Sequence, residues 1–454
     1  MTAGQLTSLV TTTVVCCSLA FVIFTFLARQ SSKRHRVLGC GRVGLLSNSN
    51  LSDQYSSIHN GHGTAASSPK VKALFVYPIK SCGIIELSET DVIATGFRYD
   101  RQFSFAQLHS EEVARAEDDT GVQSQPKYKW TCITQRKVRQ LSQIHTELWL
   151  PDQSSPEYSP DLEWVKSGGC LVCKFPFTPN LGFWNVFEWQ TLQDVWTIVE
   201  AKIAARSLSA EPMVQFRLPL EPDAIRSAKH SREIMHIWKD APEAINVTSE
   251  IPPSTLAKLK SFFEMSNPLA LFMADPSKRR DVFRNAPTIE EAGYQPGTGF
   301  ADAYPLTFMG LASVQDVASK IKRPQPFNLS ALRFRANIYF TGGPPYVEDT
   351  WKKVRIGSLS YHISSRTTRC ELPNVDPETG NRDRQEPLRV LRKARAYVDE
   401  GAGPDPCLGM SAVPLLKAEN ACERLCVGDD IVVESTGEHY YIRMFPKGEP
   451  VKFS

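Results

Sequence analysis

The chain has 454 residues, of which 42% are hydrophobic and 22% are charged. These proportions are ordinary for a globular protein with room for two or more domains, and they exclude collagen, low-complexity chains and small disulfide-stabilised domains. The formal net charge is +3, but five basic side chains and no acidic one fall within residues 1–52. Removing these five from the 52 basic residues leaves 47 against 49 acidic residues. This balance argues against a nucleic-acid-binding body, which would carry a basic surplus.

The eleven cysteines are scattered and odd in number, which favours a reducing compartment over a disulfide framework. Cys170 and Cys173 have CxxC spacing, and Cys422 and Cys426 are four residues apart. Zinc needs about four ligands. We therefore expect no zinc at either pair.

The N-terminal region predicts a membrane anchor. After a short segment of residues 1–8, residues 9–28 carry no charged side chain, and this run is about as long as a bilayer crossing requires. Basic residues follow the run, which argues against a cleaved secretory signal and predicts a cytosolic C-terminal body. A buried core helix is the alternative. Residues 29–69 are rich in Ser, Asn, Gly and His, so we expect a flexible tether there.

The next part of the chain has the pattern of a β-rich body. Runs of β-branched and aromatic residues bounded by Pro and Gly predict strands, which cover residues 71–76, 91–94, 102–106, 171–175 and 184–189. Apolar residues at helical spacing predict helices, over residues 192–208 and 254–265. Polar stretches predict surface loops, over residues 108–128 and 151–160.

The C-terminal third returns to strands. Residues 313–316 have the form of a capping box ahead of a short helix, and Glu386-Pro387 opens another with Leu388 and Leu391 inward. Strands are expected over residues 334–340, 354–364, 431–434 and 439–445, with a hairpin signal at Thr436-Gly437 between the last two. The fold class is therefore α+β and mainly β, in two parts.

Cys370 is the first candidate for chemistry. It follows an expected strand, lies near Arg366 and Arg369 in the sequence and precedes the turn formers Asp376-Pro377. An exposed cysteine near positive charge favours the thiolate, which attacks electrophiles or binds metal. A buried, inert cysteine is the alternative.

A second candidate segment contains Lys80 and Ser81, with Arg101 downstream. A point charge, a hydroxyl and a guanidinium fork at the ends of strands are what phosphate binding requires. A solvated loop would have the same composition, so that alternative stays open.

A third candidate segment contains Arg333, Arg335 and Asn337. Alternation along a strand would place these three side chains on one face, where they could recognise a polar ligand. An exposed sheet face is the alternative.

Together these segments resemble a known family. The motifs that carry the resemblance are Tyr77-Pro-Ile-Lys-Ser81, Asp100-Arg101, Phe334-Arg-x-Asn-Ile338, Glu348-Asp349 with Trp351, Arg369-Cys370 and Val375-Asp-Pro-Glu-Thr-Gly380. They resemble molybdenum cofactor sulfurase C-terminal (MOSC) proteins with an N-terminal β-barrel domain, and above all the mitochondrial amidoxime-reducing component, whose members also begin with a short membrane anchor. The resemblance runs from about residue 71 to 433. It implies a MOSC N-terminal β-barrel domain over residues 70–273 and a MOSC domain, also a β-barrel with short helices, over residues 274–454.

The resemblance also implies roles for single residues. Cys370 matches the cysteine whose thiolate binds molybdenum in a molybdenum-pterin cofactor, and this ligand role makes it the catalytic residue. The residues that match contacts to the phosphate and pterin of that cofactor are Lys80, Ser81, Arg101, Arg335, Asn337 and Arg369. Residues 303–305 are Ala-Tyr-Pro where the family commonly has a Thr-Ser-Pro type segment, so Tyr304 stands in place of the expected hydroxyls.

The implied activity is the reduction of N-oxygenated substrates such as amidoximes, hydroxylamines or nitrite. The sequence has no Walker or GxSxG motif, and we expect electrons from partners, which the resemblance suggests are a cytochrome b5-type haem protein and its flavin reductase. The expected location is the mitochondrial outer membrane, with the endoplasmic reticulum as the alternative. Two other functions stay open: a cofactor or sulfur carrier that uses Cys370 as a persulfide, and a non-catalytic membrane-tethered binding protein. The extra length around residues 108–128 and 191–237 could cover the site or bind a partner, and we expect surface elaboration instead.

Overall fold

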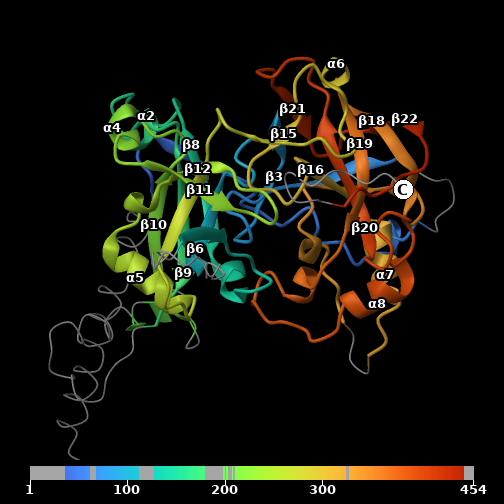
Figure 1. Ribbon diagram of the computed structural model, residues 1–454, viewed down its shortest axis with the longest axis horizontal. Helices are drawn as coiled ribbons and strands as arrows, with labels where there is room; N and C mark the ends of the chain where they lie inside the picture. Colours follow the sequence, from blue (N-terminus) through green and yellow to red (C-terminus); the bar gives the residue numbers. More distant parts are fainter. Residues whose placement is uncertain are drawn as a thin grey trace, which may run out of the picture.

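The computed structural model describes residues 36–61, 68–111, 127–178, 210–323 and 327–443, together with 198, 199, 201, 202 and 207. Strands dominate this part of the chain and the helices are short (Figure 1), so the prediction of a mainly β fold is confirmed. The predicted membrane span over residues 9–28 and the predicted strand over 184–189 lie outside the described residues, as does most of the predicted helix over 192–208. Among the described helices, none has the length and apolar character needed to cross a membrane.

One half of the molecule contains a closed barrel beside a four-stranded sheet. The barrel has the order β11-β12-β13-β6-β7, with β6 (Phe103–Glu111), β7 (Lys127–Cys132), β11 (Ser231–His236), β12 (Glu243–Asn246) and β13 (Leu269–Ala274). The sheet has the order β1-β8-β9-β10, with β1 (Cys40–Val43), β8 (His145–Pro151), β9 (Cys170–Pro176) and β10 (Met213–Pro219). The connections contain η2 (Arg139–Gln143), α2 (Glu163–Lys166), α4 (Ala224–Ser227) and η3 (Thr248–Glu250).

Helix α5 (Pro253–Phe262) joins the barrel to the four-stranded sheet. Its Phe262 ring lies 5.4 Å from that of Phe175 on β9, and the next residue, Phe263, lies 5.5 Å from Phe105 on β6. Pro253 begins the helix, where a missing N–H costs nothing. The predicted helix over residues 254–265 is confirmed.

The other half is built on an eight-stranded sheet of order β22-β18-β19-β20-β16-β17-β2-β3. Its strands are β2 (Lys70–Val76), β3 (Ile85–Leu87), β16 (Leu306–Gly310), β17 (Ile338–Thr341), β18 (Trp351–Ile356), β19 (Leu359–Thr368), β20 (Cys407–Pro414) and β22 (Ile431–Thr436). Smaller sheets are formed by β21 (Glu423–Cys426), β4 (Glu89–Ile93) and β5 (Gly96–Phe97), and by β14 (Arg280–Asp281) and β15 (Gly297–Thr298). The helices are η1 (Ser57–His59), α6 (Ile289–Ala292), α7 (Leu311–Ser319), η4 (Ala331–Phe334), η5 (Val347–Thr350), η6 (Leu372–Asn374) and α8 (Leu388–Arg395).

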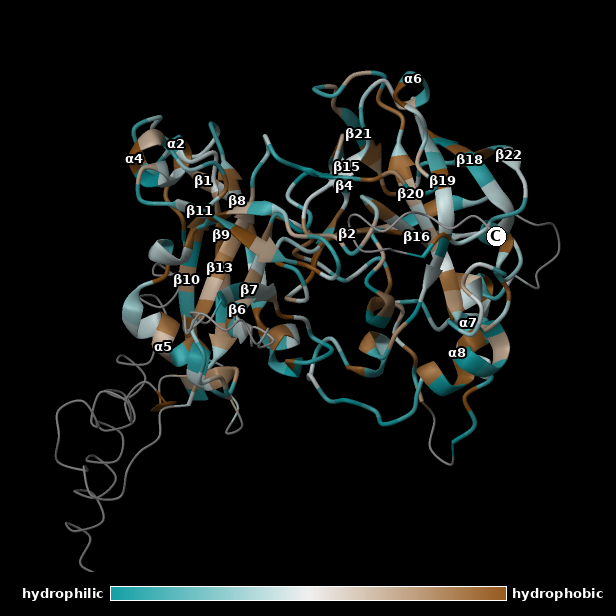
Figure 2. Cartoon of the chain, viewed as in Figure 1, coloured by the Kyte–Doolittle hydropathy of each residue, from teal (hydrophilic) through white to brown (hydrophobic). Residues whose placement is uncertain are grey.

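The core follows the apolar strands. Every residue of β20 is buried, and all but the last residue of β13 are buried as well. Hydrophobic residues accordingly concentrate on such strands, while the connecting loops are mainly hydrophilic (Figure 2).

The first strands of the expected N-terminal domain, residues 70–273, pack with the second half of the molecule. β2 pairs with β17 in antiparallel register, Leu74 opposite Ile338, so the segment from β2 to β5 packs with the C-terminal half. The chain therefore crosses from one half to the other and back before β14. The physical reason is the apolar face of β2, because Leu74, Ile338 and Phe340 are all buried in one cluster.

The prediction of a flexible tether over residues 29–69 is wrong for residues 36–61. β1 pairs with β8, Cys40 opposite Pro151, and Leu51 is buried against the second half. Lys72 on β2 donates to Asp53 at 2.9 Å. The polar composition of this segment conceals a few apolar anchors, and these residues hold it to the body.

Most other predicted elements agree with the structure, and four differ. The strand predicted over residues 354–364 is two strands, because β18 ends at Ile356 and β19 begins at Leu359. Helix α7 begins at Leu311, and Ser313 lies inside it, where its hydroxyl donates to Glu348 at 2.8 Å instead of capping the helix. Residues 334–340 are not one strand, because η4 ends at Phe334 and Arg335 has a φ of +52°. β22 runs through to Thr436, and no strand follows it within the described residues up to 443. The helix expected after Glu386-Pro387 is α8, with Leu388 and Leu391 buried.

Candidate cofactor site

The turn between η4 and β17 is the hub of the candidate site. Arg101 donates to the Arg335 carbonyl and to Asn337 Oδ1, both at 3.0 Å. Arg335 donates to the Cys82 carbonyl at 2.8 Å, and Arg369 donates to the Phe334 carbonyl at 3.0 Å. The structure thus brings together predicted cofactor residues from three distant parts of the sequence.

Two guanidinium groups share the ring of Tyr77. Arg101 and Arg335 each lie 4.3 Å from its centroid, and the Tyr77 hydroxyl donates to the Ala336 carbonyl at 2.8 Å. Arg101 forms an ion pair with the buried Asp100. Arg335 is also buried, yet it pairs with no carboxylate in the described part of the chain, and burial lowers its pKa. One positive charge at this point is therefore uncompensated.

Three predicted cofactor residues have left-handed backbone conformations. The φ angles of Ser81, Arg101 and Arg335 are +66°, +47° and +52°. Such angles are uncommon for residues with side chains, and they persist where the surrounding structure fixes them, often at functional sites.

Lys80 and Asp302 form the next part of the site. The buried Lys80 ammonium donates to the Phe300 carbonyl at 2.8 Å and forms an ion pair with Asp302. Desolvation alone would raise the pKa of Asp302, but the positive charges of Lys80 and Arg101 hold it well below its usual range. The Asp302 side chain is still 67% exposed. A carboxylate that is ionised, held in place and open to solvent can accept hydrogen bonds from a ligand.

Trp238 also contacts Asp302, and sequence reasoning missed both residues. The Trp238 indole N–H donates to Asp302 at 3.0 Å, and the Arg136 guanidinium lies 4.7 Å from its ring. Trp238 is 46% exposed and has a φ of +56°. Ile237 and Asp240 exchange backbone hydrogen bonds around it, so Trp238 is the first central residue of a two-residue hairpin turn between β11 and β12. Glycine is the usual residue there, and a tryptophan in that position is the signal that could have revealed it.

Cys370 and Arg369 follow the end of β19. Cys370 is exposed, as predicted, and its sulfur accepts the Leu372 N–H at 3.5 Å. Arg369 donates to the Leu408 carbonyl at 2.8 Å, but its Nη2 is buried with no hydrogen-bond partner in the described ranges. Burial lowers the pKa of Arg369 to about 10. The result is a second uncompensated guanidinium, directly before an accessible thiol.

The other two arginines of these segments have structural partners. Arg366 forms an ion pair with Asp399 at 3.1 Å, so its charge is neutralised there instead of acting on Cys370. Arg333 does not share a strand face with Arg335. It lies in η4 and forms an ion pair with Asp376 at 2.6 Å. That contact fixes the loop that follows Cys370.

The Tyr304 ring does not supply the hydroxyl expected of residues 303–305. Its hydroxyl donates to the Arg284 carbonyl at 2.8 Å, and its ring packs with Val282 and Val413. In this segment the polar group at the site is Asp302, one position before the predicted stretch.

Comparison with family models matches residues 68–155 to the MOSC N-terminal beta barrel domain and residues 296–431 to the MOSC domain. The chain is a MOSC-domain protein. The N-terminal match begins before β2 and ends after β8, so it takes in strands from both halves of the molecule. The MOSC match contains Arg335, Asn337, Arg369 and Cys370.

Curated relatives of this MOSC protein include mitochondrial amidoxime-reducing component 1 from Mus musculus, 38% identical over 96 residues, which are 21% of this chain and 27% of that protein. The component 1 from Danio rerio is 31% identical over 153 residues, 33% of this chain and 44% of that protein. A molybdenum cofactor sulfurase from Caenorhabditis briggsae is 38% identical over 84 residues, 18% of this chain and 12% of that protein. The chain thus matches less than half the length of each of these relatives.

The residues of the site fit an anionic cofactor held by one thiolate. Arg335 is buried and Arg369 is partly buried, and both donate hydrogen bonds only to carbonyls among the described residues, so an anionic ligand would supply the missing charge. Within the described ranges, no group of three or more His, Cys, Asp or Glu side chains could hold a metal ion.

Proposed function

We propose that this MOSC protein is a molybdenum-cofactor-dependent reductase of N-oxygenated compounds such as amidoximes, hydroxylamines or nitrite. The observation that carries the proposal is the accessible Cys370 thiol next in sequence to a partly buried guanidinium, Arg369, that has no anionic partner in the described structure. The names of the amidoxime-reducing and cofactor-sulfurase relatives support the same chemistry.

Each group of the site then has a role. Cys370 would bind the molybdenum as a thiolate. Lys80, Ser81 and Arg101 would hold the phosphate and pterin of the cofactor. Further pterin contacts would come from the side chains of Arg335, Asn337 and Arg369. A molybdenum-pterin cofactor, when bound, supplies two-electron transfer with uptake of an oxygen atom. The strained, hydrogen-bonded backbone around these side chains keeps them in position before the cofactor arrives.

Asp302 is suited to orient the substrate. An amidoxime has N–H and O–H donors, and the ionised, accessible Asp302 carboxylate can accept one of them. Lys80 and Trp238 hold that carboxylate from two other directions. Reduction of the amidoxime then takes two electrons and two protons and yields an amidine and water.

We infer that the electrons come from a cytochrome b5-type haem protein and its flavin reductase. The uncharged run of residues 9–28 would anchor the chain in a membrane with its body in the cytosol, at the mitochondrial outer membrane or alternatively the endoplasmic reticulum. Confinement to one surface raises the effective concentration of electron donor and acceptor. The mitochondrial names of the relatives support the first location.

The accessible thiol and the cofactor-sulfurase relative favour a second candidate, in which Cys370 carries sulfur as a persulfide. A tethered binding protein without catalysis is the third candidate.

Molybdenum and pterin analysis of the purified full chain separates the three candidates. We expect about one molybdenum per chain, lost in Cys370→Ala and retained in the matched exposed-cysteine control Cys422→Ala. A persulfide on Cys370 without molybdenum would favour the sulfur carrier. The absence of both molybdenum and persulfide would favour the binding protein. Full turnover of an N-hydroxylated substrate by Cys370→Ala with an artificial donor would refute the reductase mechanism.

A further inference from the structure

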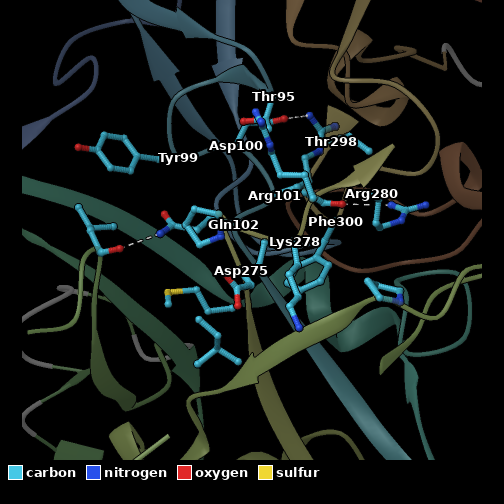
Figure 3. A pocket seen from close by; sticks show the side chains of 18 of the residues that line it. Thr95, Tyr99, Asp100, Arg101, Gln102, Asp275, Lys278, Arg280, Thr298 and Phe300 are labelled. Carbon is cyan, nitrogen blue, oxygen red and sulfur yellow. Dashed lines mark hydrogen bonds and ion pairs between the residues drawn. The ribbon is translucent and has the colours of Figure 1, made fainter. Parts of the chain in front are cut away.

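A separate cavity lies between the barrel and the small sheets of the other half. Its volume is about 550 Å³, within the usual range for small-molecule sites. Its walls come from both halves, with Phe97 of β5 and Thr298 of β15 on one side and Ile245 of β12 and Met273 of β13 on the other. Figure 3 shows Gln102, Asp275 and Phe300 gathered around this space. Of the predicted cofactor residues only Arg101 lines it, and the Arg101 guanidinium is bound to Asp100 and Asn337.

The cavity offers no free positive charge. Its lining includes Arg98, Arg101, Arg232, Lys278, Arg279 and Arg280. Each of these six side chains forms an ion pair with a carboxylate. The exposed Glu221, in contrast, lines the cavity and has no ion pair within the described residues. This charge balance of the lining disfavours an anionic ligand and favours a neutral or singly positive one.

Three polar atoms of the lining residues are buried and have no hydrogen-bond partner in the described structure. They are Gln102 Oε1, Thr298 Oγ1 and His230 Nδ1. Gln102 already uses its amide N–H₂ on the Leu220 carbonyl at 2.8 Å. His230 Nε2 lies 3.0 Å from the Glu250 carboxylate, and the tautomer that donates to Glu250 leaves Nδ1 as an acceptor. Two of the three atoms therefore need a donor, and the Thr298 hydroxyl can accept one too.

We propose that this cavity binds an aromatic amine, neutral or singly protonated. The ring would lie against Phe97, Phe300 and Met273, and its N–H groups would donate to the acceptors in the wall after small torsional adjustments of Gln102 and Thr298. An unpartnered buried acceptor carries a desolvation penalty, and an N–H donor removes it. This proposal does not depend on molybdenum or on Cys370.

Isothermal titration of the purified full chain with 2-aminoquinoline tests the proposal, with 2-methylquinoline as a probe of the same shape that lacks the N–H donors. We expect one saturable site for the amine and binding of the methyl analogue about tenfold weaker, as the loss of one buried hydrogen bond implies. Equal affinity for the two probes, or no binding of the amine at millimolar concentration, would overturn the proposal.

Two variants locate the binding. Thr298→Val keeps the side-chain shape and removes an acceptor, and we expect it to weaken amine binding several-fold without lowering thermal stability, because an unsatisfied hydroxyl is replaced by a methyl group. Glu221→Gln, at the exposed part of the lining, should weaken binding of the protonated amine at least twofold, whereas Glu157→Gln in the loop after β8 should leave it unchanged. Amine affinity unaltered in both Thr298→Val and Glu221→Gln would place the amine elsewhere and refute the assignment.

Discussion

Replacing Glu348 with Gln should remove a pH dependence from the stability of the fold. Glu348 lies in η5 and is fully buried. Its oxygens accept the Ser313 hydroxyl at 2.8 and 3.0 Å and the Gly310 N–H at 3.2 Å. Burial, and after it the charge of Asp349, raises the pKa of Glu348 from 4.5 to about 7. The unfolded chain therefore loses this proton at lower pH than the folded chain does.

The size of the effect follows from the two pKa values. At 1.36 kcal/mol per pH unit, the difference corresponds to about 3 kcal/mol. The wild-type free energy of unfolding should fall by up to this amount as pH rises from 4.5 to 7, because the folded state retains a proton that the unfolded state releases. Glu348→Gln keeps an acceptor for Ser313 and Gly310 and cannot ionise.

Urea unfolding between pH 5 and pH 8.5 measures the prediction. We expect similar stability of variant and wild type at the acidic end, and a variant more stable by about 2 to 3 kcal/mol at pH 8. Glu157→Gln in an exposed loop is the matched control and should follow the wild type throughout. If the unfolding free energies of Glu348→Gln and wild type run parallel across this range, the assignment of a buried, protonated Glu348 is refuted.

Three further outcomes are expected. Trp238→Gly should change the unfolding free energy by no more than about 1 kcal/mol, because relief of the left-handed strain offsets the lost contacts to Asp302 and Arg136; a loss above about 3 kcal/mol in urea unfolding would contradict this balance. Arg335→Met should abolish most of the rise in Tm that inorganic pyrophosphate gives the cofactor-free wild type; an unchanged rise would show that this guanidinium does not attract the anion. Deletion of residues 1–30 should give a soluble chain that is active with artificial donors, and a purified truncation that still sediments with membranes would refute the anchor.

Local residue patterns were sufficient to predict strands and helices whose own sequence favours that structure. The strands at β2 and β9 and the helix α5 follow from runs of apolar and β-branched residues or from helical spacing. Pairing between distant strands was not accessible in the same way. β2 lies between β3 and β17 in the sheet, and nothing in its own residues identifies a partner more than 260 positions away. The packing of β2 in the sheet of the second half was not predicted for this reason.

The charged residues of the candidate site were predicted from their residue types and motifs. The prediction failed where backbone conformation determines the position of a side chain. Lys80, Arg101 and Arg335 were found because their residue types suit an anion. The face that Arg333 was expected to share was lost because Arg335 turns the chain with a positive φ, which no alternation pattern contains. Asp302 was missed because an ordinary Asp gives no local signal. Its relevance comes only from its contacts to Lys80 and to Trp238, which reaches it from the other half.

The structure shows which positive charges of the body are neutralised and which are not. Composition gives a nearly neutral body, but such a body can still attract an anion where an arginine has no carboxylate partner. Four arginines have a similar sequence context but different partners. Arg366 forms an ion pair with Asp399, and Arg333 forms one with Asp376. Arg335 and Arg369 instead donate to carbonyl oxygens. Burial without a counter-ion destabilises the folded chain, so the fold must offset this cost elsewhere until an anion is bound. The same argument predicts that binding of the anionic cofactor and stability of the turn between η4 and β17 are coupled.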